Sequence, residues 1–193
     1  QVLVRRARAG ERLVTLDGAD RELGAHMLLI TDGERGIALA GVMGGLDSEV
    51  TAGTTRILLE SARFAGRSVR RTSRELGLRS EASLRFEKEV NPDGVIPALN
   101  RAASLLCAIA GGRALAGHAE AKLDAPAPRK VRISAARVNE LLGTELPAED
   151  ILALFGRLSF EVSPPTAGME FLVTVPLRRG DISRPEDLIE EAA

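Results

Sequence analysis

Aromatic residues are scarce in this sequence of 193 residues, which contains no tryptophan, no tyrosine and only five phenylalanines. Proteins that bind single-stranded nucleic acid by stacking need exposed aromatic side chains as platforms for the bases. The composition therefore disfavours a base-stacking module.

Cysteine and histidine are also scarce, with one cysteine, Cys107, and two histidines, His26 and His118. A single cysteine cannot form an internal disulfide, and this usage is typical of the reducing cytoplasm. Neither histidine has a cysteine, a serine or a second histidine at a useful spacing, so we predict neither a zinc site nor a catalytic triad. Cys107 falls within a helical pattern and is interpreted as a small core residue.

The sequence also lacks an excess of charge of either sign, since 26 basic and 27 acidic residues give a net charge of −1. Any surface for nucleic acid must therefore be local. No apolar run approaches the roughly 20 residues that span a bilayer, and no signal peptide opens the chain, so we expect no membrane partner. The chain begins at Gln1 and stops inside an acidic helical pattern, which we interpret as a piece of a longer protein.

The hydrophobic patterns predict an α+β fold in two parts. Residues 1–122 combine short strands, in a mixed or mostly antiparallel sheet, with packed helices. Residues 123–129 are interpreted as a proline-containing linker. Residues 130–193 predict a strand, two helices and a two-stranded β-wing, which is a small winged-helix-like module.

The longest predicted helix starts at Asn91, a good N-cap, with Pro92 at its first position. Pro97 lies inside the pattern, so the regular helix starts late or kinks. The expected core-facing stripe consists of Val95, Leu99, Ala102, Leu106 and Ile109.

A glycine turn, Gly41-x-x-Gly44-Gly45, follows the apolar run that starts at Ile37. It has neither the GxGxxG spacing of a dinucleotide site nor the Lys-Ser/Thr of a P-loop. Two interpretations stay open: a turn that needs positive φ, or a place where the backbone comes close to a ligand.

Glu60 ends a second apolar segment, Ile57-Leu58-Leu59, which we predict as a buried strand. Burying an unpaired carboxylate is expensive. Glu60 is therefore either a structural carboxylate paired with a downstream arginine or a polar group that points into an apolar cavity.

The predicted helix over residues 65–76 carries Arg67, Arg70, Arg71 and Arg74 on one face. A solvated basic face and a contact with a phosphate backbone are both consistent with this pattern.

The tail of the chain concentrates acidic residues at the start of another helix. Pro185 opens this helix and places Asp187, Glu190 and Glu191 on one face, with Asp181 in the loop before it. Crowded carboxylates need a cation or a basic partner, and hard oxygen ligands suit magnesium or calcium. The alternative is an exposed acidic helix start, which the helix dipole favours.

Several of these motifs, in the same order and spacing, resemble the bacterial phenylalanine–tRNA synthetase β subunit family, over nearly the whole chain. The editing region of that family is similar to Leu39-Ala40-Gly41-Val42-Met43-Gly44-Gly45, Leu58-Leu59-Glu60-Ser61-Ala62 and Leu76-Gly77-Leu78-Arg79-Ser80-Glu81-Ala82-Ser83. The winged-helix-like module that follows is similar to Arg179-x-Asp181-Ile182 and Asp187-Leu188-Ile189-Glu190-Glu191.

The resemblance implies a cytoplasmic enzyme of two α and two β subunits, with ATP-dependent aminoacylation in the α subunit. The region seen here would hydrolyse tyrosine wrongly attached to the phenylalanine tRNA. An apolar pocket rejects an added hydroxyl only weakly, so a second, hydrolytic site is needed.

The resemblance also implies roles for single residues. Glu60 would accept the tyrosine hydroxyl, and an attacking water would perform the hydrolysis. The pocket walls would consist of Ala40, Gly41 and Gly44 on one side and Ser80 and Ala82 on the other. A magnesium ion shared with the α subunit would be held by Asp181, Asp187, Glu190 and Glu191.

This sequence departs from the family pattern at some positions. Ser80 stands where many members have threonine, and Leu84 replaces a frequent histidine. A His-Ala-Phe-Asp motif, whose histidine assists editing in the family, would lie upstream of Gln1. We therefore expect this chain to carry half of an editing site.

A second hypothesis is a non-catalytic nucleic-acid-binding or subunit-docking module. An exposed basic recognition helix within residues 134–158 would favour it. That segment offers Arg137 and Arg157 but also Glu140, Glu145, Glu149 and Asp150, so docking through the acidic tail fits better than DNA binding.

Overall fold

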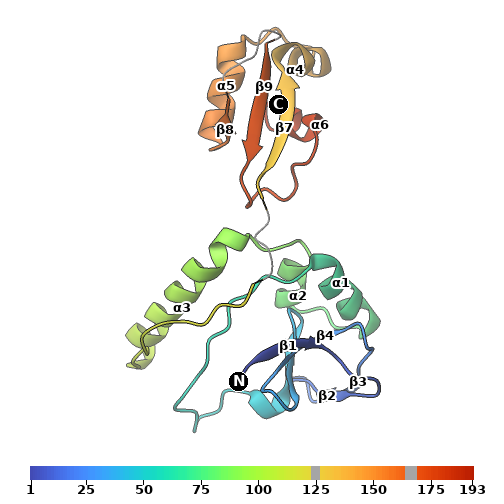
Figure 1. Ribbon diagram of the computed structural model, residues 1–193, viewed down its shortest axis with the longest axis vertical. Coiled ribbons are helices and arrows are strands. Elements are labelled where there is room, and N and C mark those ends of the chain that lie inside the picture. The colour runs from blue at the N-terminus through green and yellow to red at the C-terminus, as the bar shows by residue number, and fades with distance from the viewer. Residues whose placement is uncertain (123–126, 164–168) are drawn as a thin grey trace. The chain divides into compact units, whose positions relative to one another are not determined.

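The computed structural model describes residues 1–122, 127–163 and 169–193 (Figure 1). Its contacts divide the chain into two compact units, the first formed by residues 1–90 and 94–115 and the second by residues 91–93 and 116–193. Each unit contains helices and antiparallel strands, so the predicted α+β class is confirmed. Residues 123–126 of the predicted linker lie outside the described residues.

The first unit contains a four-stranded antiparallel sheet in the order β1-β4-β5-β6 and a separate hairpin, β2-β3. The strands are β1 (Leu3–Arg6), β2 (Arg12–Val14), β3 (Asp20–Glu22), β4 (Leu28–Thr31), β5 (Gly36–Leu39) and β6 (Met43–Gly44). A bridge between Thr15 and Gly45 joins the hairpin to the end of the sheet. Asp17 and Gly18 lie in the turn between β2 and β3, and Gly18 takes the positive φ that a tight turn requires.

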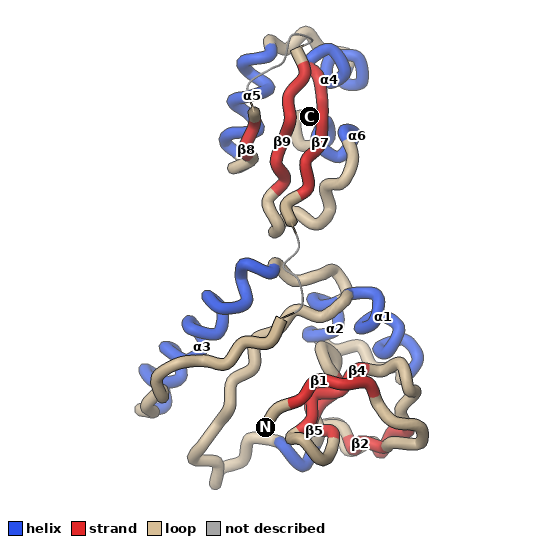
Figure 2. The backbone as a smooth tube through the Cα atoms, in the orientation of Figure 1, coloured by secondary structure: helices blue, strands red, loops and turns tan. Residues whose placement is uncertain are grey.

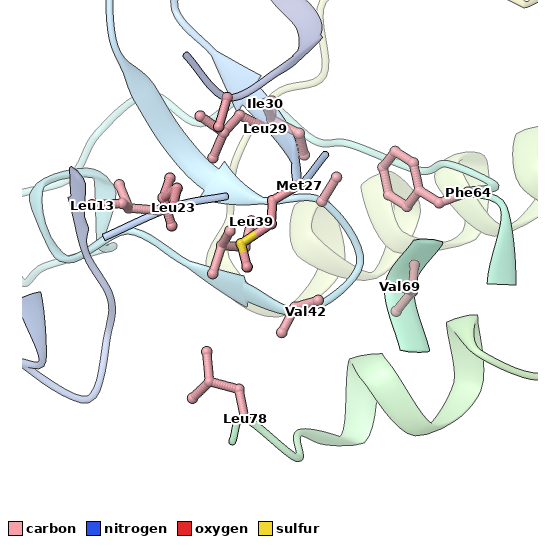
Figure 3. Packing of buried hydrophobic residues seen from close by; sticks show 12 residues of the cluster. Leu13, Leu23, Met27, Leu29, Ile30, Leu39, Val42, Phe64, Val69 and Leu78 are labelled. Atoms are coloured by element: carbon pink, nitrogen blue, oxygen red, sulfur yellow. The ribbon is translucent and has the colours of Figure 1, made fainter. Parts of the chain in front are cut away.

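The helices of the first unit are η1 (Leu46–Ser48), α1 (Gly66–Glu75), α2 (Glu81–Phe86) and α3 (Val95–Ala110), and the short turn η2 (Pro92–Gly94) comes directly before α3 in the chain. The core lies where the sheet meets α1 and the segment before it (Figure 3). The centre of this core consists of Met27, Leu29 and Leu39 from the sheet, packed against Phe64 and Val69 from α1 and the segment before it. This packing fixes the turn after β5 against α1 and α2.

The prediction of a strand over Ile57-Leu58-Leu59 is wrong. Residues 49–65 form neither helix nor strand, and this segment is drawn as loop in Figure 2. Ile57 is 51% exposed and Leu58 is 81% exposed. A strand needs a neighbouring strand for its backbone groups, and an apolar run alone does not supply one. In the described residues this run pairs with no strand.

Helix α3 also differs from expectation, because its apolar stripe is not buried. Val95 and Leu99 are half-buried, whereas Ile109 is 82% exposed. The helix starts at Val95, after a turn in which the Asn91 side chain accepts the N–H of Asp93 at 3.1 Å. Pro97 therefore sits in the first turn, where proline is tolerated.

The helical stretch Pro92–Ala110 has 19 residues and a mean hydropathy of 1.2 in its most apolar window, with none of that window buried. By length and composition it meets the requirement for a membrane span, so the expectation that no apolar run approaches this length was wrong. Length and composition alone are a weak criterion, since helices of soluble proteins also meet it.

The second unit contains a three-stranded antiparallel sheet in the order β7-β9-β8. Its elements are β7 (Arg129–Ser134), α4 (Ala135–Leu142), α5 (Ala148–Arg157), β8 (Glu161–Val162), β9 (Glu170–Val175) and α6 (Pro185–Glu190). Ser134 caps α4 by accepting the N–H of Arg137 at 3.2 Å, and Gly143 ends it with a positive φ. Phe155 and Phe171 are fully buried at the centre of the core. The predicted strand, two helices and β-wing are present in this order.

Candidate functional site

Gly41 follows β5 and adopts φ +69°, so the prediction of a turn that needs positive φ is confirmed. A Cβ atom at this position would lie 3.1 Å from the side chains of Phe64, Val69 and Phe86. The two phenylalanine rings pack with their centroids 5.3 Å apart. The close approach at Gly41 is therefore to other side chains of the domain core.

Ser80 links the turn to helix α2. Its Oγ donates to the carbonyl of Val42 at 2.5 Å and accepts the backbone N–H of Ser83 at 3.0 Å. The Ser83 hydroxyl in turn accepts the N–H of Ser80 at 3.0 Å, which completes a capping box. Residues 76–87 thus contain a capped helix that is hydrogen-bonded to the glycine turn.

The other residues predicted for the pocket walls, Ala40, Gly44 and Ala82, lie after β5, in β6 and in α2. Ala40 is buried, and its N–H donates to the carbonyl of Leu28 at 3.0 Å. A Cβ at Gly44 would lie 3.1 Å from Leu16, which follows the hairpin strand β2. Ala82 is half-buried in α2. The structure therefore brings Ala40, Gly41 and Ser80 to one turn, whereas Gly44 lies against Leu16.

Glu60 lies in the exposed loop between η1 and α1 and not at the end of a buried strand. Among the described residues it makes no hydrogen bond or ion pair, so the interpretation as an arginine-paired structural carboxylate is wrong. Partial desolvation raises the pKa of its carboxyl, although the residue as a whole is exposed. Its neighbours anchor the loop, since Ser61 Oγ donates to the carbonyl of Val95 at 2.7 Å and Phe64 packs beside Gly41. An unpaired carboxylate on an anchored loop can accept a hydrogen bond from a ligand.

Arg179 binds two carboxylates of the acidic tail, and the sequence analysis did not predict this role. Its guanidinium donates to both oxygens of Glu191, at 2.8 and 2.5 Å, and to Asp181 Oδ2 at 2.6 Å. Arg179 Cζ also lies 5.7 Å from the ring centroid of the buried Phe160. These hydrogen bonds lower the pKa of both Asp181 and Glu191. The signal in the sequence was the Arg179-x-Asp181 spacing before an acidic helix.

Asp187 has a different task, because it caps helix α6. Its Oδ2 accepts the backbone N–H groups of Ser183 and Arg184, at 2.7 and 2.9 Å, and these bonds lower its pKa. Glu190 is exposed at the end of the helix.

The four predicted magnesium ligands do not fit the ion in this arrangement. Residues 1–122, 127–163 and 169–193 contain no group of three or more His, Cys, Asp or Glu side chains placed to hold a metal. Both Asp181 and Glu191 already bind the guanidinium of Arg179, which supplies the positive charge that crowded carboxylates need. A divalent cation there would have to displace Arg179 from its partners.

Family comparisons define the class to which these two units belong. Residues 1–111 match the B3/4 domain, and residues 131–193 match the tRNA synthetase B5 domain. The first match covers more than half of the chain, and the chain therefore belongs to the B3/4 domain family.

Similarity to named proteins extends over the whole chain. It is 50% identical to the phenylalanine–tRNA ligase β subunit of Moorella thermoacetica and 47% identical to that of Bacillus subtilis, in each case over 100% of this chain and 24% of the relative. The β subunit of Anaeromyxobacter dehalogenans is 49% identical over 99% of this chain and 24% of the relative. The resemblance drawn from the motifs is confirmed, and the chain spans about a quarter of the length of the relatives it matches.

A crystal structure of an N-terminal fragment of the phenylalanyl-tRNA synthetase β subunit from Pyrococcus horikoshii aligns with 99% of this chain and 55% of that fragment. The alignment has a TM-score of 0.46 and 15% sequence identity.

Proposed function

We propose that this chain is the proofreading section of a phenylalanine–tRNA ligase β subunit, and that it takes part in hydrolysing tyrosine from mischarged phenylalanine tRNA. The observation that carries the proposal is the identity of 47–50% along the whole chain to β subunits of this ligase. Tyrosine and phenylalanine differ by one hydroxyl, which an apolar synthetic pocket excludes poorly, so a second site must remove the error.

Glu60 is the residue that would distinguish the two amino acids. Its carboxylate is unpaired among the described residues and partly desolvated, so a phenolic hydroxyl can donate to it without displacing another donor. A hydrogen bond to a charged group contributes about 1.5–3 kcal/mol. With phenylalanine this carboxylate would have no partner, and the correct product would be bound more weakly.

The wall of the pocket would be the turn Ala40–Gly41 together with Ser80, which holds α2 against that turn. These groups position the substrate and do not attack it. No serine or cysteine is hydrogen-bonded to His26 or His118 in the part of the chain that the structure describes. This fits hydrolysis by a water molecule and not by a covalent nucleophile.

In the complete enzyme, aminoacylation would take place in an α subunit that uses ATP, and two α and two β subunits would assemble in the cytoplasm. The acidic tail of the second unit is the docking surface that we propose for the α subunit. Magnesium binding by Asp181, Asp187, Glu190 and Glu191 would require Arg179 to release two of these carboxylates.

A nucleic-acid-binding role for the second unit alone has less support. Arg137 on α4 forms an ion pair with Glu140 at 2.8 Å and lies 3.8 Å from Glu186. Glu149 and Asp150 are exposed in the first turn of α5. Acidic side chains thus surround the basic ones on the helices that would have to meet a phosphate backbone.

The proposal can be tested in the complete two-subunit enzyme by following the release of tyrosine from mischarged phenylalanine tRNA. The parent should release tyrosine rapidly, and Glu60→Ala should release it at least tenfold more slowly, because the hydrogen bond that favours tyrosine is lost. Glu49→Ala is the matched control, since Glu49 is an exposed glutamate in the same loop.

Two results would contradict the proposal in different ways. If neither parent nor variant releases tyrosine, this region acts as a scaffold and not in proofreading. If parent and Glu60→Ala release tyrosine equally fast, proofreading stands but Glu60 does not select the hydroxyl.

A further inference from the structure

The outer face of helix α1 carries a row of four arginines that the proofreading chemistry does not use. Arg67, Arg70, Arg71 and Arg74 recur at spacings of three and four residues, so they share one face of the helix. All four are exposed, and together with Glu75 they line an open, shallow hollow of about 610 Å³. At 1.5 Å per residue the row is about 10 Å long.

Little negative charge offsets this row. In the described residues Arg67, Arg70 and Arg74 have no ion pair, and Arg71 lies 3.8 Å from Glu75. The same Glu75 carboxylate also lies 3.0 Å from Nε2 of His26. Elsewhere in this unit arginines do have close partners, as in the pair of Arg5 with Glu11 at 2.7 Å.

Helix α1 cannot rotate to bury these arginines, because its opposite face is packed in the core. Val69, Thr72 and Ser73 are buried on that face. Like charges at i and i+4 each destabilise a helix by about 0.2–0.5 kcal/mol, and this helix contains two such pairs. A bound polyanion would remove that repulsion.

We propose that this row, Arg67, Arg70, Arg71 and Arg74, binds the phosphate backbone of the tRNA whose aminoacyl end is proofread. This inference rests on the proposed function for the identity of the RNA. Guanidinium groups form paired hydrogen bonds with phosphate oxygens, and four arginines along about 10 Å of helix can contact successive phosphates of one strand. The face has no apolar side chain that could insert into lipid, which favours a nucleic acid over a membrane surface.

The experiment measures the affinity of the complete two-subunit enzyme for uncharged phenylalanine tRNA at several salt concentrations. One variant replaces Arg67, Arg70 and Arg74 by glutamine, which keeps the helix propensity and removes three charges. The matched control is R6Q/R8Q/R12Q, which removes three charges from exposed arginines outside α1. Thermal melting checks that both variants are folded.

The α1 variant should bind more weakly, and the slope of log affinity against log salt should become shallower by about two to three, since each phosphate contact contributes roughly 0.7–0.9. The control should keep the parental slope. Equal slopes in the parent and the α1 variant, or the same loss in both variants, would overturn the proposal.

Vesicles rich in phosphatidylserine form the second arm of the test. If the parent binds them and the α1 variant does not, while tRNA affinity is the same in both, the row is a lipid surface and the RNA proposal fails. Binding is measured without hydrolysis, so a parent that binds tRNA through α1 but releases no tyrosine would contradict the proofreading role alone.

Discussion

Arg179 and Glu191 are joined by two parallel hydrogen bonds, from Nη1 to Oε2 at 2.8 Å and from Nη2 to Oε1 at 2.5 Å. The pair connects the segment after β9 to the end of α6. Only 23% of each side chain is exposed, so solvent screens the pair less than an ordinary surface ion pair. Helix α6 is short, and Arg179 holds its last turn in place.

Replacing Arg179 by glutamine should lower the free energy of unfolding of the second unit by about 1–3 kcal/mol, because Asp181 and Glu191 would lose their charged partner. Urea unfolding followed by circular dichroism measures this effect. Arg157→Gln is the control, since Arg157 is exposed and makes no ion pair in the described residues. Equal stability of the two variants would show that the Arg179 cluster contributes nothing to the fold.

A pH dependence is expected from Arg5 and Glu11. Two hydrogen bonds from Arg5 lower the pKa of Glu11 from 4.5 to about 2. A carboxyl with a lowered pKa in the folded state stabilises the protein above its unfolded pKa, and this contribution is lost as the pH falls from about 4.5 towards 2. The difference in unfolding free energy between parent and Arg5→Gln should therefore be about 1–3 kcal/mol at pH 7 and shrink towards zero in acid.

Thermal melts of both proteins across this pH range provide the test. Arg12→Gln is a suitable comparison, because the Arg12–Asp20 pair is about half exposed and should contribute little at any pH. A gap between parent and Arg5→Gln that stays constant down to pH 2 would contradict the assignment.

Local signals were enough to predict the second unit from the sequence. Ser134, Gly143 and Pro147 mark the boundaries of α4 and α5, and each acts through the residues beside it. The first unit was predicted less well, because Ile57 and Leu58 in the loop, and Leu106 and Ile109 on α3, are apolar but exposed in this chain. An apolar sequence favours burial, but whether another part of the chain packs over it depends on the tertiary fold.

The candidate site shows the same division. Positive φ at Gly41 follows from a glycine-rich turn between strands, and it was one of the two interpretations that the sequence left open. The hydrogen bond from Ser80 to Val42 joins residues 38 positions apart, and the pairing of Arg179 with Glu191 depends on where the chain turns between β9 and α6. Neither contact is encoded by local spacing.

Gly41→Ala should lower the free energy of unfolding of the first unit by more than the cost of placing alanine at a positive φ. A left-handed conformation costs a residue with a Cβ about 1–2 kcal/mol, and at Gly41 the new atom would also press on three side chains at 3.1 Å. Gly77→Ala is the matched control, since Gly77 has φ +64° and nothing within 4 Å of the added atom. Chemical denaturation should show a larger loss for Gly41→Ala, and equal losses would exclude a packing role for this glycine.

Ser80→Ala should remove both the cap of α2 and the bond to Val42. Loss of an N-cap typically costs about 1 kcal/mol, and the unsatisfied carbonyl of Val42 adds to it. Ser134→Ala removes a cap without a second bond of this kind and gives the reference value. Ser80→Thr keeps the hydroxyl and should restore most of the stability. If Ser80→Ala costs no more than Ser134→Ala, the bond to Val42 does not contribute.

The most direct measurement of the proofreading role compares how fast the complete enzyme hydrolyses tyrosine and phenylalanine from the same tRNA. The parent should prefer tyrosine, and Glu60→Gln should reduce that ratio of rates by roughly fivefold, because a charged acceptor worth about 1.5–3 kcal/mol is replaced by a neutral one worth about 0.5–1.5 kcal/mol. The phenylalanine rate should change little. An unchanged ratio in Glu60→Gln, or no preference for tyrosine in the parent, would contradict the account.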